Sequence, residues 1–291
     1  MSATLGPGGN DGGEMAGQFD GKVAFITGAA RGQGRSHAVR FAEEGADIIA
    51  IDICQQLDSV AYPLASREDL DETVNLVEKT GRRIIAEQSD VRDFAGLQAV
   101  LDTAVAELGR LDFVLANAGL APGAGLPQPS MSAYVDAIDV MLNGVYFTIE
   151  AALPALLDRD DGGAIVITSS AAGLKSIGRS FDTREHGLAG YTAAKHGVVG
   201  LMRYFATILA EKNIRVNSVH PTGVATPMIQ NDAVEGYARE HPSFAAAFQN
   251  MLPVDVIEPK DVSEAMIYLC SEAGRYVTGV TLALDAGILL K

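Results

Sequence analysis

The stretch Val23–Gly34, which reads VAFITGAARGQG, decides the fold of this chain. It begins with a nearly continuous apolar run, as in a parallel strand that is covered on both faces. The glycines that follow allow a tight turn, and they let backbone N–H groups approach a pyrophosphate at the positive end of the next helix. A strand-to-helix turn without a ligand can use the same residues. The candidate cofactor-binding residues of this turn are Gly28, Arg31, Gly32, Gln33 and Gly34.

The alternation of strand and helix continues outward from this stretch along the chain. Seven β-branched runs are strand candidates: VAFIT, DIIAID, RIIAEQSD, DFVLAN, AIVITSS, RVNSVHP and VTLALD. Segments with helical period lie near residues 33–44, 67–80, 94–108, 131–158, 190–212 and 260–272. This order predicts a single doubly wound α/β Rossmann domain over residues 20–291, a parallel seven-stranded sheet with helices on both faces. Residues 1–19 are rich in glycine and show neither period, so we expect a flexible N-terminal tail.

Composition and charge exclude several classes of function. The 291 residues carry 22 Lys and Arg against 37 Asp and Glu, and the net charge of −15 repels nucleic acids and anionic lipid surfaces. No apolar run reaches the roughly 18 residues of a membrane span. Cys54 and Cys270 are too few for a disulfide framework or a zinc cluster, and the five histidines show no metal-ligand spacing. We therefore expect a cytoplasmic protein without a metal site and without a nucleic-acid or membrane partner.

An acidic residue follows the glycine turn at the distance that dinucleotide binding requires. Asp52 ends the run DIIAID, 18 residues after Gly34, close to the roughly 20 at which a carboxylate accepts hydrogen bonds from the adenosine ribose. Its charge repels a 2′-phosphate, so the sequence favours NAD over NADP. Arg31 is the counter-argument, because a guanidinium in the glycine turn can pair with that phosphate.

These features resemble the short-chain dehydrogenase/reductase family, whose glycine motif TGxxxGxG matches residues 27–34. The resemblance covers nearly the whole chain from Lys22 onward. It implies further cofactor contacts at Asp90, Val91, Asn117, Ala118, Gly119, Pro221, Val224 and Thr226. In the last of these segments the family uses backbone groups and a Thr to hold the nicotinamide carboxamide, and here Thr222 is interposed between Pro221 and Gly223.

The resemblance also gives roles to a Tyr, a Lys and a Ser. Tyr191 and Lys195 are four residues apart on one helical face, and Ser170 ends a strand where open parallel sheets bind ligands. Oxidation of an alcohol needs a base, and Tyr with its ordinary pKa of about 10 is a poor one at neutral pH. We expect the Lys195 ammonium and the oxidised nicotinamide to lower the pKa of Tyr191, both side chains to contact the cofactor, and Ser170 to orient the substrate. A surface Tyr–Lys pair beside a strand-end Ser is the alternative.

Two departures from the family pattern bear on this site. Met141 stands where the family has an Asn that helps to hold a water of the proton relay. Asn143 lies about 200° further around a helix and cannot take that place from the same face, whereas the backbone carbonyl of Met141 still can. Ser170 and Tyr191 are also 21 residues apart, more than in most of the family, and the extra residues are expected to form a loop near the site mouth.

A second enlargement separates Asp52 from the next strand, over residues 53–83. Together with the glycine turn and the segment NSVHPTGVATPMI, it is similar to the carveol dehydrogenase-like, mycofactocin-coupled branch of the family. The resemblance implies an NAD that stays bound and is reoxidised by an external redox carrier. The enlarged segment offers a physical reason for retention if it lies over the adenosine end, and a solvated helical insertion is the alternative.

Residues 227–258 occupy the place of the family's substrate lid. Apolar residues that could face a substrate there are Met228, Ile229, Phe244, Phe248, Met251 and Leu252. They favour a hydrophobic secondary alcohol of carveol or terpenoid type, or its ketone, although a helical core face is an equal alternative. The family usually forms tetramers, so we expect a homotetramer that uses helices near 131–158 and 190–212.

The resulting prediction is an NAD-dependent alcohol dehydrogenase with Ser170, Tyr191 and Lys195 as its catalytic residues. One rival is a protein that holds NAD without turnover, as a redox sensor or scaffold, and Met141 at the relay position motivates it. Another is a ketone or enone reductase in the cell, because the same site catalyses both directions.

Overall fold

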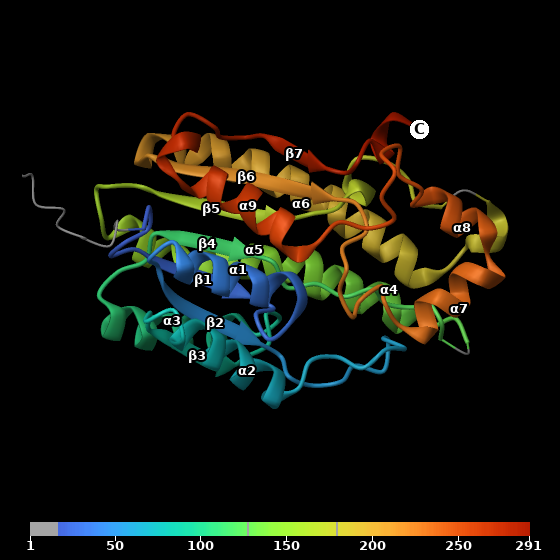
Figure 1. Ribbon diagram of the computed structural model, residues 1–291, viewed down its shortest axis with the longest axis horizontal. Coiled ribbons are helices and arrows are strands. Elements are labelled where there is room, and N and C mark those ends of the chain that lie inside the picture. The colour runs from blue at the N-terminus through green and yellow to red at the C-terminus, as the bar shows by residue number, and fades with distance from the viewer. Residues whose placement is uncertain (1–16, 127, 179) are drawn as a thin grey trace, which may run out of the picture.

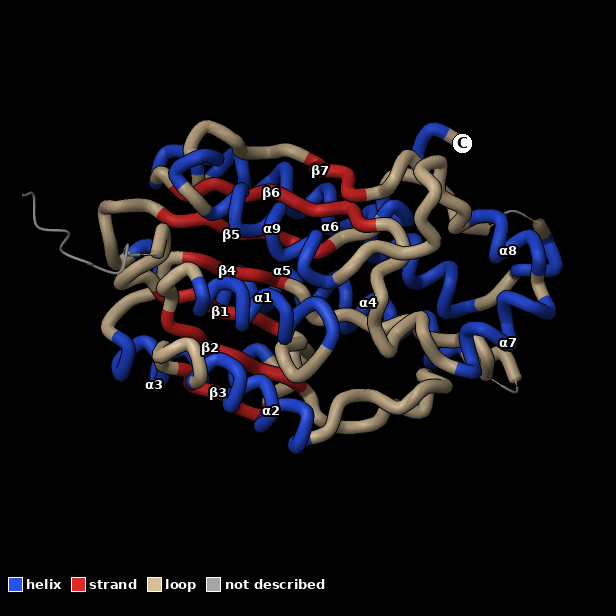
Figure 2. The backbone as a smooth tube through the Cα atoms, viewed as in Figure 1, coloured by secondary structure: helices blue, strands red, loops and turns tan. Residues whose placement is uncertain are grey.

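The fold is built on one sheet of seven parallel strands in the order β3-β2-β1-β4-β5-β6-β7 (Figures 1 and 2). The computed structural model describes residues 17–126, 128–178 and 180–291. In these ranges the strands are β1 Val23–Thr27, β2 Asp47–Asp52, β3 Ile84–Gln88, β4 Phe113–Ala116, β5 Gly163–Thr168, β6 Ile214–Pro221 and β7 Thr281–Leu284. The strand order reverses between β1 and β4, and open α/β sheets bind ligands beyond the carboxyl ends of the strands at such a reversal. The predicted fold class is confirmed.

Helices cover both faces of this sheet. Their bounds are α1 Gly32–Glu43, α2 Arg67–Glu78, α3 Phe94–Leu108, α4 Met131–Ile138, α5 Gly144–Leu157, α6 His186–Ile208, α7 Asp232–Glu240, α8 Pro242–Ala247 and α9 Pro259–Cys270. Figure 1 shows α1 and α9 in front of the sheet and α5 and α6 behind it. The pair α7 and α8 stands apart from these layers, beyond the carboxyl ends of the strands (Figure 1).

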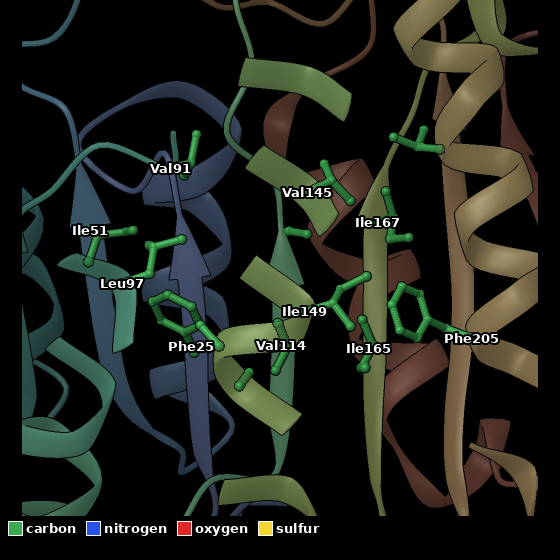
Figure 3. Packing of buried hydrophobic residues seen from close by; sticks show 14 of the residues in the cluster. Phe25, Ile51, Val91, Leu97, Val114, Val145, Ile149, Ile165, Ile167 and Phe205 are labelled. Carbon is green, nitrogen blue, oxygen red and sulfur yellow. The ribbon is translucent and has the colours of Figure 1, made fainter. Parts of the chain in front are cut away.

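Each face of the sheet is filled by its own apolar core. Along β2, Ile49 and Ile51 belong to the core under α3, α5 and α6, whereas Ile48 and Ala50 belong to the core under α1, α2 and α9. Successive side chains of a strand point to opposite faces, so a strand that is covered on both sides must be apolar throughout. Figure 3 shows Phe25 among the residues of the first of these cores.

The N-terminal boundary of the packed domain is a correction to the sequence analysis. Phe19, which the expected tail 1–19 includes, is buried and stacks on Phe41 at 5.0 Å between ring centroids. Its backbone N–H donates to the Glu44 carbonyl at 2.8 Å. Residues 1–16 lie outside the described residues, so the expectation of a tail stays a prediction for them, and the packed chain already includes Phe19.

Two helices differ from their predicted bounds. The helix expected near 131–158 is interrupted by a π-helical turn over Asp139–Asn143, which separates α4 from α5. The helix expected near 190–212 begins at His186, because the Glu185 side chain caps it by accepting from the Leu188 N–H at 2.9 Å. By length and composition the helical run Met131–Leu157 could cross a membrane, but half of its most apolar window is buried inside the protein, and the core helix of a globular domain passes the same test.

Candidate functional site

The glycine turn between β1 and α1 is packed so tightly that its glycine positions do not accommodate a side chain without strain. Gly28 and Gly32 have φ of 68° and 56°, in the left-handed region that favours glycine. A Cβ atom at Gly34 would lie 2.0 Å from the Gly28 carbonyl oxygen, far inside contact distance. The turn therefore leaves a cradle in front of the N-terminus of α1, where backbone N–H groups and the helix dipole favour an anion.

This cradle opens into a cavity that we call the glycine-loop cavity. Twelve of the predicted cofactor-binding residues line it: Gly28, Arg31, Gly32, Gln33, Gly34, Asp52, Asp90, Val91, Asn117, Ala118, Gly119 and Thr226. They come from the ends of β1, β2, β3 and β4 and from the segment after β6. Residues far apart in the sequence thus meet at the carboxyl edge of the sheet.

Asp52 lies at one end of the glycine-loop cavity with its carboxylate fixed from both sides. The Ala30 N–H donates to Oδ2 at 3.0 Å and the Cys54 N–H donates to Oδ1 at 3.2 Å. Burial raises the pKa of Asp52, and these backbone bonds oppose the shift. The remaining lone pairs can accept from ribose hydroxyls.

Asp90 and Asn117 line the same cavity and also bond within the protein. The Arg92 guanidinium holds the Asp90 carboxylate in an ion pair of 2.6 Å. Asn117 joins neighbouring strands, because its Nδ2 donates to the Thr27 carbonyl at 3.1 Å and its Oδ1 accepts from the Thr168 hydroxyl at 3.1 Å. The Asn of this motif therefore fixes the strand ends around the cavity.

A second cavity of about 240 Å³, here called the lid cavity, lies between the end of β6 and the helices α7 and α8. Ser170, Tyr191, Pro221 and Val224 line it, and so do Met228, Ile229, Phe244 and Phe248 from the predicted lid. The other two predicted lid residues do not, since Met251 and Leu252 are 56% and 61% exposed on the outside. Only part of the predicted apolar lining is therefore correct.

The two cavities share three lining residues, Gln33, Thr226 and Met228. The Gln33 Oε1 atom is buried there and has no hydrogen-bond partner within the described part of the chain. Thr226 fits against the glycine turn, because a Cβ atom at Gly32 would lie 3.2 Å from its methyl group. A molecule that extends from one cavity to the other must pass these side chains.

Ser170, Tyr191 and Lys195 converge where the lid cavity meets the sheet. Ser170 follows β5, and its side chain is hydrogen-bonded to Tyr191. Lys195 lies one helical turn after Tyr191 on α6, with Nζ 5.7 Å from the centre of the Tyr191 ring. Lys195 is buried, and its ammonium donates to the Thr168 carbonyl at 2.7 Å.

Burial acts on the ionisation of both α6 side chains. It lowers the pKa of Lys195 to about 8, so the ammonium is charged at neutral pH. It raises the pKa of Tyr191, and the hydrogen bond to Ser170 opposes this shift. A positive charge beside the ring acts in the opposite direction to burial, because it favours the phenolate.

Met141 lies inside the π-helical turn and is fully buried. A Cβ atom at Gly119 would lie 3.7 Å both from the Met141 sulfur and from Lys195 Nζ, so the thioether and the ammonium face the same loop. Asn143 is exposed and donates to Asp139 at 2.9 Å. As expected from its position, Asn143 does not replace the missing amide.

Three residues near the site were given no role by sequence reasoning. Tyr62, from the enlarged segment after β2, is buried in the glycine-loop cavity, and its hydroxyl accepts from the Ala121 N–H at 3.1 Å. His220 bonds the Ser170 carbonyl through Nδ1 at 2.9 Å, and burial lowers its pKa to about 4. Thr222 lines the lid cavity. The only sequence signal for His220 was its position directly before Pro221. No signal pointed to Tyr62, because it lies inside a long insertion.

Comparison with known proteins decides the family. A family model described as enoyl-(acyl carrier protein) reductase matches residues 28–289. The (−)-trans-carveol dehydrogenase of Rhodococcus erythropolis is 46% identical, over 94% of this chain and 99% of that protein. The chain belongs to the short-chain dehydrogenase/reductase family.

Solved structures of short-chain dehydrogenases agree with this assignment. The crystal structure of carveol dehydrogenase from Mycobacterium avium in complex with NAD has a TM-score of 0.86 and 47% identity, covering 94% of this chain and 100% of that one. The structure of a short-chain dehydrogenase from Mycobacterium paratuberculosis bound to NAD has a TM-score of 0.86 and 43% identity over the same shares.

The residues of this short-chain dehydrogenase fit a nicotinamide dinucleotide. The glycine cradle at the start of α1 suits a pyrophosphate, and the Asp52 carboxylate suits ribose hydroxyls. The unpartnered Gln33 oxygen lies where the two cavities meet and can accept from a carboxamide N–H. Arg31, which could have argued for NADP, donates instead to the Pro63 carbonyl at 2.6 Å.

Proposed function

We propose that this protein is an NAD-dependent dehydrogenase that interconverts a hydrophobic secondary alcohol and its ketone. One observation carries the proposal: Ser170 and Tyr191 line a cavity that meets the glycine-loop cavity at Gln33, Thr226 and Met228. A substrate hydroxyl at Tyr191 would therefore lie beside the inner end of a dinucleotide whose phosphates occupy the glycine cradle.

The proposed mechanism assigns proton handling to three side chains. Ser170 orients the substrate oxygen, and Tyr191 takes the hydroxyl proton during alcohol oxidation or returns it during ketone reduction. Lys195 contributes its ammonium beside the Tyr191 ring and thereby favours the phenolate. NAD, when bound, accepts or gives the hydride and adds a positive charge in its oxidised form. Met141 leaves only backbone groups for a water at the relay position.

The lid cavity supports the substrate class. Its lid-side wall is apolar at Met228, Ile229, Phe244 and Phe248, and apolar walls with a few polar groups are typical of small-molecule sites. Ser170 and Tyr191 are the polar groups on the side of the sheet and α6, and Gln33, Thr222 and Asp255 add further polar groups elsewhere in the lining. The apolar wall beside Ser170 and Tyr191 suits a ring or chain of carbon with a hydroxyl, as in carveol, the alcohol for which the relatives from Rhodococcus erythropolis and Mycobacterium avium are named.

We further propose that the NAD remains bound between turnovers and that an external redox carrier reoxidises it. Residues 53–66 after β2 form part of the wall of the glycine-loop cavity with Leu57, Tyr62 and Leu64. Three hydrogen bonds tie this segment to the glycine turn and to the loop after β4: Arg31 to the Pro63 carbonyl at 2.6 Å, Ala121 N–H to the Tyr62 hydroxyl at 3.1 Å, and Gly123 N–H to the Ser59 carbonyl at 3.0 Å. Cofactor release requires at least part of this wall to open.

The remaining proposals concern assembly and location. Tyr146 on α5 and Tyr204 on α6 are 40% and 58% exposed and lie on the helices that we expect in the interface of a homotetramer. We retain the cytoplasm as the proposed compartment.

The first experiment compares the wild type with Tyr191→Phe. Purified, desalted protein is mixed with carveol, with and without added NAD, and the absorbance of reduced nicotinamide is recorded. A rise in the wild type and a loss of roughly 10² to 10⁴-fold in Tyr191→Phe are expected, because the general base is gone. A rise without added NAD supports retention, and a rise only with added NAD rejects it. Equal traces for both proteins over a panel of alcohols would favour the NAD-holding sensor or scaffold.

A further inference from the structure

The side chain of Thr222 holds the part of the lid that closes the lid cavity on its outer side, here called the outer wall. Thr222, the residue between Pro221 and Gly223, is buried, and its hydroxyl donates to the Asn250 Oδ1 atom at 2.6 Å. Thr222 lies at the end of β6, on the sheet side of the cavity, whereas Asn250 belongs to the lid. The bond therefore joins the two sides of the cavity directly.

Asn250 passes this attachment on to the wall itself. Its Nδ2 atom donates to the Val254 carbonyl at 2.8 Å and to the Asp255 carbonyl at 3.2 Å, which closes residues 250–255 into a loop. The lid cavity is lined by Phe248 just before this loop, by Asp255 at its end and by Val256 just after it.

A second support holds the same loop from outside. The N–H groups of Met251 and Leu252 both donate to the Ala286 carbonyl at 3.0 Å, and Lys291 Nζ donates to the Asn250 carbonyl at 3.0 Å. Lys175, five residues after Ser170, donates to the Ile288 carbonyl at 2.8 Å. Residues 285–291 thus connect the lid loop with the segment that follows Ser170.

The other end of the lid is attached differently. No side chain of α7 is fully buried, but Val234 and Ala238 line the lid cavity and the Tyr237 ring packs against Phe244 at 5.1 Å between centroids. The N-cap Asn231 bonds to neighbours in its own segment, the Pro227 and Met228 carbonyls and the Val234 N–H. Side-chain packing thus attaches α7, whereas hydrogen bonds attach residues 249–256, among them the partly buried bond between Thr222 and Asn250.

We propose that Thr222 and Asn250 are positioning residues that hold the outer wall of the lid cavity in place before the substrate binds. The proposal rests on the proposed function in so far as the lid cavity takes the alcohol. If the wall is ordered before the substrate binds, binding does not include the loss of conformational entropy that ordering it requires. Removing the bond should therefore raise KM for bulky alcohols more than it changes kcat.

The test uses Thr222→Val, which keeps the shape and removes the hydroxyl, and Thr222→Ser, which keeps the hydroxyl. In Thr222→Val we expect amide hydrogen exchange in residues 249–255 to accelerate roughly three- to tenfold, and KM for carveol to rise by a similar factor. Exchange in β5, kcat and NAD binding are expected to stay within about twofold. Thr222→Ser should match the wild type, and so should Thr207→Val on the exposed face of α6, where the same chemical change is far from the lid.

A double-mutant cycle adds a second measurement. If the two side chains act through one bond, Thr222→Val combined with Asn250→Ala should exchange no faster than Asn250→Ala alone. Wild-type exchange and KM in Thr222→Val overturn the proposal, and so does a Thr222→Ser that behaves like Thr222→Val. Faster exchange with an unchanged KM rejects the role in positioning. A wild type that oxidises no alcohol rejects the proposed function, and the exchange comparison still decides whether the bond holds the wall.

Discussion

At the scale of the residue, Lys195 shows how the candidate site uses burial. Its side chain is 3% exposed, yet it carries an ammonium whose partners are the Thr168 carbonyl and the Tyr191 ring. Burying a charge without a carboxylate partner is unfavourable, and this is why the pKa falls to about 8. The same desolvation strengthens the field that the ammonium exerts on Tyr191.

This burial predicts a cost in stability that is present at neutral pH and disappears as the pH rises. Between about pH 8 and 10 the unfolded chain binds a proton at Lys195 that the folded protein has released, so the contribution of Lys195 to the free energy of unfolding rises with pH over that window. Lys195→Met should therefore be more stable than the wild type at pH 7, by roughly 1 to 3 kcal/mol, and the difference should shrink towards pH 10. Denaturant unfolding at several pH values measures it. Lys212→Met, an exposed control just after α6, should show no such trend. If the stability difference between Lys195→Met and the wild type stays constant with pH, the pKa of Lys195 is not lowered.

At the scale of the element, the glycine turn and the segment after β2 form the two sides of one cavity. The turn is rigid because its backbone is packed so tightly that a Cβ atom at Gly34 would overlap the Gly28 carbonyl group. Residues 53–66 have no helix or strand, and one hydrogen bond joins them to the turn and two join them to the loop after β4. One side is therefore permanent, and the other can open at moderate free-energy cost.

The permanent side is tested with Gly34→Ala. A methyl group there meets the Gly28 carbonyl oxygen at 2.0 Å, so the turn must move, and we expect the free energy of unfolding to fall by about 1 to 3 kcal/mol and NAD binding to weaken. Gly200→Ala on α6 is the matched control, since nothing lies within 4 Å of its added methyl group. Thermal unfolding with and without NAD should show Gly200→Ala as stable as the wild type or more so, by about 0.5 to 1 kcal/mol.

The opening side is tested with Tyr62→Phe. The change removes the acceptor of the Ala121 N–H and keeps the buried ring, so NAD should leave the protein roughly three to ten times faster, as expected for one hydrogen bond. Release is followed by the loss of bound NAD during dilution or gel filtration. Tyr276→Phe, at a side chain that is 88% exposed, is the control. An unchanged release rate in Tyr62→Phe would show that residues 53–66 do not retain the cofactor.

At the scale of the whole molecule, one apolar surface is left uncovered by the residues that the structure describes. The helical run Met131–Leu157 is apolar enough to span a membrane, and half of its most apolar window lies outside the core. Tyr146 and Tyr204 are partly exposed, and their rings lie 6.1 Å and 5.3 Å from that of Phe205 between centroids. A second copy of the chain that packs on α5 and α6 would remove this surface from water.

The assembly predicts a change of mass on substitution. Tyr204→Glu places a charge in the proposed interface, so the homotetramer should dissociate into smaller species, measured by light scattering during gel filtration. Phe181→Glu, at a side chain that is 86% exposed in the loop before α6, should leave the mass unchanged. A wild type with the mass of a single chain would contradict the proposal.

The sheet and the glycine turn follow from the amino-acid sequence alone. Nearly continuous apolar runs that alternate with helical segments have few solutions other than a parallel sheet covered on both faces, and the turn needs glycines whose conformations other residues adopt only at a cost. The strand candidates agree with the observed strands within a few residues, and twelve predicted residues meet in the glycine-loop cavity.

The tertiary structure decided what depends on contacts between distant segments. The π-helical turn at Met141, the burial that raises the pKa of Tyr191 and the place of Tyr62 have no local signal, because each follows from packing against residues elsewhere in the chain. The same holds for Thr222, which in the sequence is an interposed residue and in the fold is bonded to Asn250, 28 positions later. Local periodicity fixes elements, whereas the environment of a side chain is set by the elements that fold around it.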